Sequence, residues 1–333
     1  MKNLFISILI GFSIVGLNSC NKEYNDELYS NMISLKAPVD GTGLYPIYLR
    51  YNPNGIIKYD LPVLLSGSLD SDKDIDVKIG VDMDTLAIFN YQKFQYRKDL
   101  YYKQLMEQFY ELPQQSVRIA KGTHTANFPI TFKFDNLDLV EQWVLPITIQ
   151  DDAAYKQNYR KGWRKALLYI KPFNNYSGLY SATAMNIYYD KETKDQMVVS
   201  NRTNWVVDEN SVFFYAGITD ERDINRSKYK VIVDFGEATE DGFGTKKGLL
   251  TVKAVNNDIG FSVIGQPTYD IRDTPDKTQP YVLHRYITMK MEYKYSDITS
   301  VPGKVLNYRA TGTMTMERKL NTLMPDEDQA IQW

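Results

Sequence analysis

The sequence predicts an all-β protein with two domains. Its 333 residues include 26 Tyr, 14 Phe and 4 Trp, and aromatic residues favour strands. Short runs in which apolar and polar residues alternate recur along the chain, and Gly, Pro, Asn and Asp separate them. The length exceeds the roughly 250–300 residues at which a single hydrophobic core stops growing, so two domains are expected.

Residues 1–19 have the layout of a secretory signal peptide, with a basic start, an apolar middle from Leu4 to Leu17 and a small residue before Cys20. The apolar run is shorter than the about 20 residues that a membrane-spanning helix needs. Cys20 is the only cysteine, and residues 17–20 (LNSC) resemble the lipobox of bacterial lipoproteins. An ordinary signal peptide with an incidental cysteine is the alternative. We expect a diacylglycerol on Cys20 to anchor the protein outside the cytoplasm.

Residues 20–30 are expected to form a polar tether. Within it, Asn21 to Glu27 carries a lysine followed by acidic residues, which resembles the export signal of Bacteroidetes lipoproteins displayed on the cell surface. A plain solvated tether in the periplasm is the alternative. We therefore expect an outer-membrane lipoprotein that is exposed on the cell surface and touches the membrane through its lipid anchor only.

Residues 31–171 are expected to form an immunoglobulin-like β-sandwich. About seven short strand-like runs occupy this region, a number and spacing typical of two packed antiparallel sheets. The clearest run places Ile75, Val77, Ile79 and Val81 on one face. The expected strands are 46–51, 61–65, 75–81, 117–119, 127–134, 143–149 and 166–170.

Residues 85–113 interrupt this pattern with a polar, Tyr-rich segment. Tyr102, Leu105 and Phe109 within it lie at helical spacing. We therefore expect a helix over residues 100–110, or a longer excursion, that covers one end of the sandwich.

Pro172 and Gly178 mark the expected joint, and residues 172–333 are expected to form the second domain. The last two strand-like runs have one apolar and one polar face, as in an antiparallel sheet that covers a core on one side. Eight or nine strands in about 150 residues predict an up-and-down barrel or a second sandwich. The expected strands are 185–190, 205–207, 212–216, 228–235, 249–255, 260–264, 285–295 and 306–317.

Several short segments, in the same order, resemble a family of Bacteroidetes surface lipoproteins encoded in polysaccharide-utilisation loci. In that family the N-terminal domain also precedes family-18 endo-β-N-acetylglucosaminidases, and the C-terminal domain is lipocalin-like. The segments are Phe89-Asn90, Leu112-Pro113, Val117 to Gly122, Trp143 to Ile147, Asn175 to Tyr180, Gly312 to Arg318 and Pro325 to Trp333. The resemblance implies a sandwich followed by a lipocalin-like antiparallel β-barrel. It also implies a glycan-handling accessory that works beside an outer-membrane importer.

Motifs for catalysis and metal binding are missing from the sequence. The formal net charge of −2 lacks the basic excess that drives nucleic-acid binding, so no nucleic-acid partner is expected. The two histidines, His124 and His284, have no set of zinc ligands around them and no nucleophile elbow beside them. Residues 70–76 resemble a calcium loop only in their aspartate spacing, and the acidic clusters suit solvated turns. We expect no enzyme activity, no catalytic residues, no metal and no cofactor.

Aromatic rings are the remaining candidates for ligand contact, because the C–H faces of sugars stack on them. The candidates are Trp205, Trp163, Tyr188, Tyr101 and Tyr102, with burial in the core as the alternative for each. We expect a surface glycan-binding protein that assists polysaccharide capture and uptake without cleaving its ligand, with an outer-membrane glycan importer as a further partner. An adhesion or structural protein that binds another protein, such as the importer, is the alternative.

Overall fold

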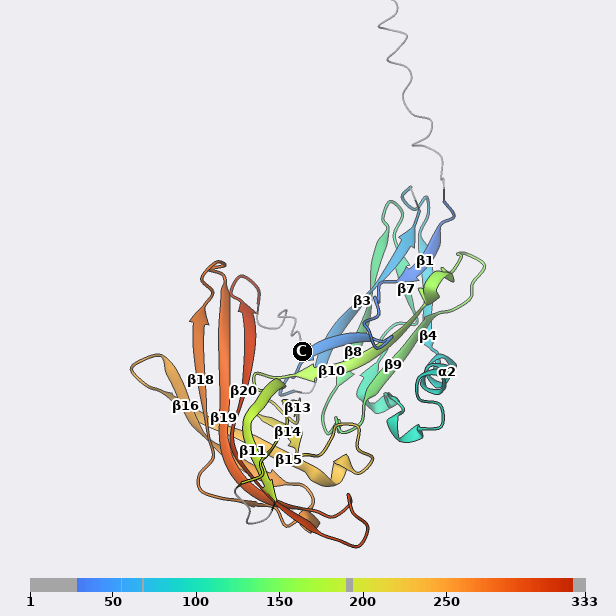
Figure 1. The fold of residues 1–333 in the computed structure, drawn as a ribbon. Helices are drawn as coiled ribbons and strands as arrows, with labels where there is room; N and C mark the ends of the chain where they lie inside the picture. Colours follow the sequence, from blue (N-terminus) through green and yellow to red (C-terminus); the bar gives the residue numbers. More distant parts are fainter. Residues whose placement is uncertain (1–28, 55, 68, 190–193, 326–333) are drawn as a thin grey trace, which may run out of the picture.

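The computed structural model describes residues 29–54, 56–67, 69–189 and 194–325. These residues form two β domains, a sandwich and a barrel, that meet at an angle (Figure 1). The predicted all-β class, with a sandwich followed by an antiparallel barrel, is therefore confirmed. The expected signal peptide, Cys20 and most of the tether lie outside the described residues. Among the described residues no helix is long and apolar enough to cross a membrane.

The sandwich packs a four-stranded sheet on a six-stranded one. The first sheet has the order β1 (Met32–Leu35), β3 (Ile56–Ser66), β8 (Thr125–Lys133) and β6 (Tyr110–Glu111). The second has the order β2 (Tyr45–Arg50), β10 (Lys165–Phe173), β9 (Trp143–Ile149), β4 (Ile75–Val81) and β7 (Ser116–Ile119), with β5 (Lys103–Gln104) beside β9. Alternate residues from both sheets fill the core, among them Ile75, Val77 and Ile79 as expected.

Of the two alternatives expected for residues 100–110, the helix is wrong and an irregular excursion is what the structure has. The α-helix of this region is α2 (Met83–Phe94), and Asp82 caps it by accepting a hydrogen bond from the Thr85 backbone N–H. The expected segment is mostly short 3₁₀ turns and two-residue strands: η2 (Lys98–Leu100), β5, η3 (Glu107–Phe109) and β6. The apolar side chains of this segment pack into two different clusters. Leu105 and Phe109 lie in the sandwich core, whereas Tyr102 packs in a separate small cluster. One helical face could not reach both.

Eight antiparallel strands close the second domain into a barrel. In ring order they are β11 (Gly178–Tyr189), β13 (Asn201–Val206), β14 (Ser211–Tyr215), β15 (Lys230–Glu240), β16 (Thr245–Ala254), β18 (Thr268–Pro275), β19 (Val282–Asp297) and β20 (Leu306–Asn321). β20 pairs with both β19 and β11, which closes the ring. The alternative of a second sandwich is thereby excluded. The short β12 (Met197–Val198) and β17 (Ser262–Val263) pair with β11 and β19 outside the ring.

The seam between β11 and β20 requires a glycine. The register of this pair shifts between Ser181 and Ala184. Gly312 is the register partner of Met185, next to the shift, and has a φ of +141°. A side chain on Gly312 would place its Cβ 2.0 Å from the Ala184 carbonyl oxygen. Only glycine allows the two strands to approach closely enough to close the barrel.

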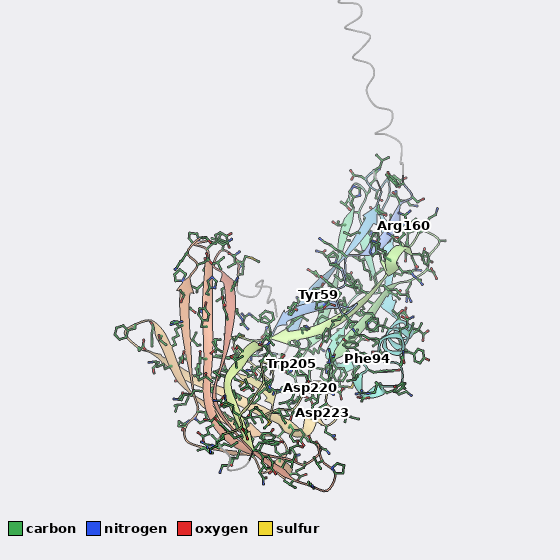
Figure 2. All side chains as sticks on the ribbon, viewed as in Figure 1. Tyr59, Phe94, Arg160, Trp205, Asp220 and Asp223 are labelled. Carbon is green, nitrogen blue, oxygen red and sulfur yellow. The ribbon has the colours of Figure 1, made fainter. Side chains whose placement is uncertain are left out.

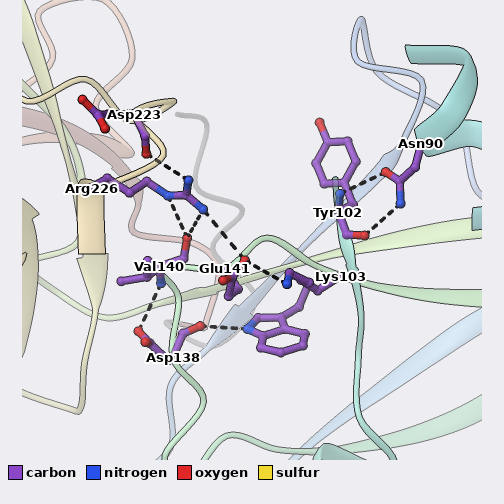
Figure 3. A network of polar contacts seen from close by, with 9 residues as sticks. Asn90, Tyr102, Lys103, Asp138, Val140, Glu141, Asp223 and Arg226 are labelled. Atoms are coloured by element: carbon purple, nitrogen blue, oxygen red, sulfur yellow. Dashed lines mark hydrogen bonds and ion pairs between the residues drawn. The ribbon is translucent and has the colours of Figure 1, made fainter. Parts of the chain in front are cut away.

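The two domains share apolar and polar contacts. Val206, Phe213 and Tyr215, from β13 and β14, are buried in the same cluster as the sandwich core. The Arg226 guanidinium donates two hydrogen bonds, of 3.2 and 3.0 Å, to the Val140 carbonyl of the sandwich (Figure 3). Lys230 lies 2.7 Å from the Asp138 carboxylate and 4.4 Å from the centre of the Phe213 ring. These contacts hold the domains in one relative position.

Phe213 and Phe214 provide a test of this coupling, because both are fully buried and they face different cores. Changing either residue to Ala should lower the free energy of unfolding by about 3–5 kcal/mol. Only Phe213→Ala should also speed amide hydrogen exchange in the sandwich strands β9 and β10. Phe214→Ala should speed exchange in the barrel alone. The same exchange pattern in both variants would contradict a core that crosses the joint.

His284 lies on the outer face of the barrel between two carboxylates. Its Nδ1 is 2.5 Å from Glu317 and its Nε2 is 2.8 Å from Asp276. These hydrogen bonds, to Glu317 first, raise the pKa of His284 above its ordinary 6.5, and the bond to His284 lowers the pKa of Asp276 below 3.8. The protonated histidine therefore stabilises the fold fully below pH 6.5, and this contribution is lost as the pH rises through the raised pKa. The Asp276 contribution is lost instead as the pH falls below 3.8.

We predict that His284→Asn costs more stability at about pH 5.5 than at about pH 9, because only protonated His284 gains from both carboxylates. Urea unfolding of the protein and the variant at both pH values measures the difference. Glu317→Gln should also cost more stability at the lower pH than at the higher one, since it removes one of the two carboxylates. A cost that is equal at the two pH values would contradict the prediction.

Candidate binding cleft at the domain joint

Two hollows that share Asn175 form a cleft at the joint between the domains, which we call the joint cleft. One hollow, of about 400 Å³, lies in the barrel between β15, β16, β18 and β19. The other, of about 750 Å³, lies on the sandwich along β2 and the start of β3. Binding sites occur preferentially at domain interfaces and in the mouths of β-barrels, and the joint cleft combines both settings.

The barrel hollow continues the inward-facing rows of the strands. Along β19, Arg285 and Ile287 precede the buried Met289 at a spacing of two. Along β18, Ile271 and Asp273 follow the buried Tyr269 in the same way. The packed core below and the open strand ends above therefore make this hollow the mouth of the barrel.

An aromatic cluster borders the barrel hollow. Tyr176 stacks on Phe235 with 3.9 Å between the ring centres, and Tyr269 meets Phe235 edge-on at 4.9 Å. Gly248 leaves room for the Tyr269 ring, because a Cβ there would come within 2.4 Å of it. Burial raises the pKa of Tyr269 to about 12, helped by the neighbouring Tyr176. Tyr176 is the member that lines the hollow and is only half-buried, so the part of its ring that Phe235 does not cover is open to a ligand.

Opposite charges pair across the strands at the edge of this hollow. Arg285 is the register partner of Asp273 and donates two hydrogen bonds to its carboxylate, of 2.8 and 2.7 Å. Glu240 is the register partner of Lys246 on the neighbouring strand pair. Carboxylates and guanidinium groups are planar and can form two hydrogen bonds at once, which suits neighbouring hydroxyls of a polar ligand.

The sandwich hollow is lined by Tyr48, Tyr51 and Tyr59, all half-buried. Burial raises the pKa of each of these phenols, so they stay neutral donors and acceptors at physiological pH. Between them Arg50 packs over the Phe173 ring at 5.0 Å and donates a hydrogen bond of 3.1 Å to Asn175. Tyr59, labelled in Figure 2, lies on β3 of the sandwich.

A hydrogen-bonded turn at residues 174–177 positions Asn175 and Tyr176. The Asn174 side chain accepts from the backbone N–H groups of Tyr176 and Ser177, at 2.9 and 2.7 Å. Its amide donates to the barrel carbonyls of Asp208 and Ser211, at 2.7 and 3.1 Å. Asn174 is 2% exposed, so these bonds are not open to competition from water. The turn connects the end of β10 at Phe173 to the start of β11 at Gly178.

The aromatic candidates from the sequence lie elsewhere and do not form one site. Tyr102 is 7% exposed, so its ring cannot serve as a sugar platform, contrary to expectation. Trp205 is half-buried and packs against the shared core near the joint, where Figure 2 labels it. Tyr101 and Tyr188 are half-buried and donate to the Gln95 carbonyl and the Gln196 side chain. Trp163 is 46% exposed beside a separate hollow of about 310 Å³ that Tyr29 and Arg160 also line.

The residues of the joint cleft were missed because no local pattern separates them from other tyrosines. Tyr48, Tyr51 and Tyr59 lie on or beside strands whose other residues build the core. Tyr176 was also not predicted as a site residue, but for this tyrosine the sequence did offer a signal, because it lies within the expected joint. Combining that joint with the preference of ligands for domain interfaces would have singled it out.

The geometry of the joint cleft suits binding. No group of three or more metal-ligating side chains occurs among the residues that the structure describes, and both histidines lie outside the cleft lining. The cleft is lined by aromatic rings, neutral phenols and pairs of oppositely charged side chains, among them the planar carboxylate of Asp273 and guanidinium of Arg285. Fold and cleft together define a two-domain sandwich–barrel protein with a preformed cleft between its domains.

Comparison with known proteins places the chain in a family. One family model, Domain of unknown function (DUF4973), matches residues 24–153, and a second, described as a C-terminal domain, matches residues 164–315. A Bacteroides ovatus structure of unknown function is 39% identical, with a TM-score of 0.80, and the match covers 91% of this chain and 100% of that one. The chain belongs to the same Bacteroides family as this protein.

Two further structures have the same two-domain fold. A Bacteroides ovatus multidomain protein including DUF1735 is 38% identical, with a TM-score of 0.80 and coverage of 90% of this chain and 99% of that one. An auxiliary nutrient binding protein from Bacteroides thetaiotaomicron is 32% identical, with a TM-score of 0.77, and the match covers 90% of this chain and 100% of that one. No curated protein matches the chain. The expected link to the domain in front of family-18 endo-β-N-acetylglucosaminidases stays a prediction.

Proposed function

We propose that the protein is a nutrient-binding accessory that holds a glycan in the joint cleft without cleaving it. The observation that carries the proposal is the cleft itself, in which the half-buried ring of Tyr176 and the hydrogen-bonded Asp273–Arg285 pair line the same hollow. A relative of 32% identity that is described as an auxiliary nutrient binding protein supports it.

The chemistry of the cleft matches that of a sugar. Each sugar ring presents an apolar C–H face, which gains from contact with an aromatic ring. Its edge carries hydroxyl groups, which lose bonds to water on binding and need donors and acceptors in return. Tyr176 supplies the first kind of contact, and the Asp273–Arg285 pair with Asn175 supplies the second.

We predict that Tyr176→Ala weakens glycan binding by about 1–3 kcal/mol, by analogy with the stacking of bases on aromatic rings. This corresponds to roughly a 5- to 150-fold loss of affinity. Native gels that contain polysaccharides from a plant, fungal and host panel identify the ligand, and titration calorimetry measures the loss. No reducing sugar should be released.

Matched variants control for this experiment. Tyr176→Phe keeps the ring and should bind nearly as well as the unaltered protein. Tyr188→Ala and Trp163→Ala remove tyrosine and tryptophan rings outside the joint cleft and should leave the affinity unchanged. If Trp163→Ala alone abolished binding, the site would lie at the opposite end of the sandwich. Measurable hydrolysis would contradict the proposal.

The alternative of a protein that binds another protein has one structural observation in its favour. Helix α2 exposes an apolar face with Met83, Ile88 and Tyr91, which are 62%, 56% and 68% exposed. Ile88 and Tyr91 are three residues apart and neighbour each other on the helix surface, and Met83 is the first residue of the helix. If no glycan retards the protein, and Ile88→Asp abolishes co-purification with an outer-membrane importer, this alternative is correct.

We infer further that Cys20 carries a lipid that anchors the protein to the outer membrane, with the domains on the cell surface. The layout of residues 1–20 supports this inference. Two acyl chains suffice for stable anchoring, so Cys20→Ala should shift the protein out of the detergent phase in a phase-partition assay. Surface exposure is measured by protease treatment of intact cells. Partition into detergent that persists in the variant would contradict the lipid anchor.

A further inference from the structure

We propose that the joint cleft takes an extended, uncharged oligosaccharide that contacts both domains at once. This inference rests on the proposed glycan-binding function. It adds the class of ligand, namely neutral rather than acidic, and the mode of binding, namely several sugar units across the joint rather than one unit in one hollow.

The size and continuity of the cleft indicate an extended ligand. The hollows measure about 400 and 750 Å³, and each lies within the range of about 300–1,000 Å³ of a pocket for a small organic ligand. Asn175 lines both, so a chain that fills one continues into the other. Each hollow offers tyrosine, Tyr176 on the barrel side and Tyr48, Tyr51 and Tyr59 on the sandwich side.

The fixed joint makes binding across both hollows favourable. Asn175 and Tyr176 are held by the turn at residues 174–177, and Arg318 donates to the Asn174 and Ser177 carbonyls at 2.9 and 2.6 Å. Arg226 and the shared core hold the domains together on another side of the joint. A ligand that spans the hollows therefore finds both already in position and pays little ordering entropy.

The charges of the cleft balance. The ionisable groups that line the two hollows, apart from tyrosines, are the cations Arg50, Lys58, Lys246 and Arg285 and the anions Asp60, Glu209, Glu240 and Asp273. Arg285 is bound to Asp273, and Arg50 donates to the uncharged Asn175 while it packs over Phe173. A uronic acid or sulfated sugar would meet as many carboxylates as cations. A neutral sugar uses both partners of each pair through its hydroxyls.

The length of the ligand is tested by calorimetry on the mature chain with manno-, xylo-, gluco- and chito-oligosaccharides of one to eight units. For one neutral series the affinity should rise by about tenfold or more, equivalent to about 1.4 kcal/mol, until the ligand spans both hollows, and should then level off. Tyr59→Ala and Tyr176→Ala should each remove this gain for long ligands. Affinity that does not depend on length, or a long ligand that is insensitive to Tyr59→Ala, overturns the extended mode.

The charge of the ligand is tested with oligogalacturonides of the same lengths. They should bind more weakly than the neutral series at both low and physiological salt. Asp273→Asn removes one anion beside Arg285 and should reduce the difference in affinity between the neutral and the acidic series. Asp195→Asn changes a residue outside the cleft lining and should leave this difference in affinity as it is. Tighter binding of the acidic series to the unaltered protein overturns the neutral preference while the glycan function stands. Absence of binding to every neutral and acidic series overturns the proposed function itself.

Discussion

The buried amide of Asn174 is the contact on which the joint cleft depends. It bonds the backbone of its own turn on one side and two barrel carbonyls on the other. A buried polar group is costly to leave without partners, so these four bonds define the course of the chain between β10 and β11. Asn175, which lines both hollows, and Tyr176, which lines the barrel hollow, take their positions from this turn.

The barrel contributes to the sandwich as well as to its own core. Strand β14 is buried along its whole length, with Phe213 and Tyr215 facing the sandwich core and Val212 and Phe214 facing the barrel. A strand with apolar residues on both faces can be stable only between two cores. The relative position of the domains is therefore set by packing. Arg226 adds hydrogen bonds to Val140 at the edge of this packing (Figure 3), and Lys230 adds one to Asp138.

A preformed and charge-balanced cleft is consistent with a capture role. Binding without rearrangement keeps the cost of association low, which suits a protein that must hold and release a nutrient. The relative described as an auxiliary nutrient binding protein shares the two-domain fold at 32% identity. No residue of α2 lines either hollow of the joint cleft, so the cleft and the exposed apolar residues of this helix are separate surfaces.

The all-β class and many strand positions followed from local patterns, because alternation reports directly which face of a strand is buried. Strands β1 and β18 were not expected from the sequence. β4 and β9 were predicted with the bounds that the structure shows. Local spacing failed at Tyr102, Leu105 and Phe109, because these residues pack into two different cores and not on one helical face. The same limit applies to the joint cleft. Tyr59 and Tyr176 are 117 residues apart in the sequence, and only the closure of the barrel and the turn at Asn174 bring their hollows together.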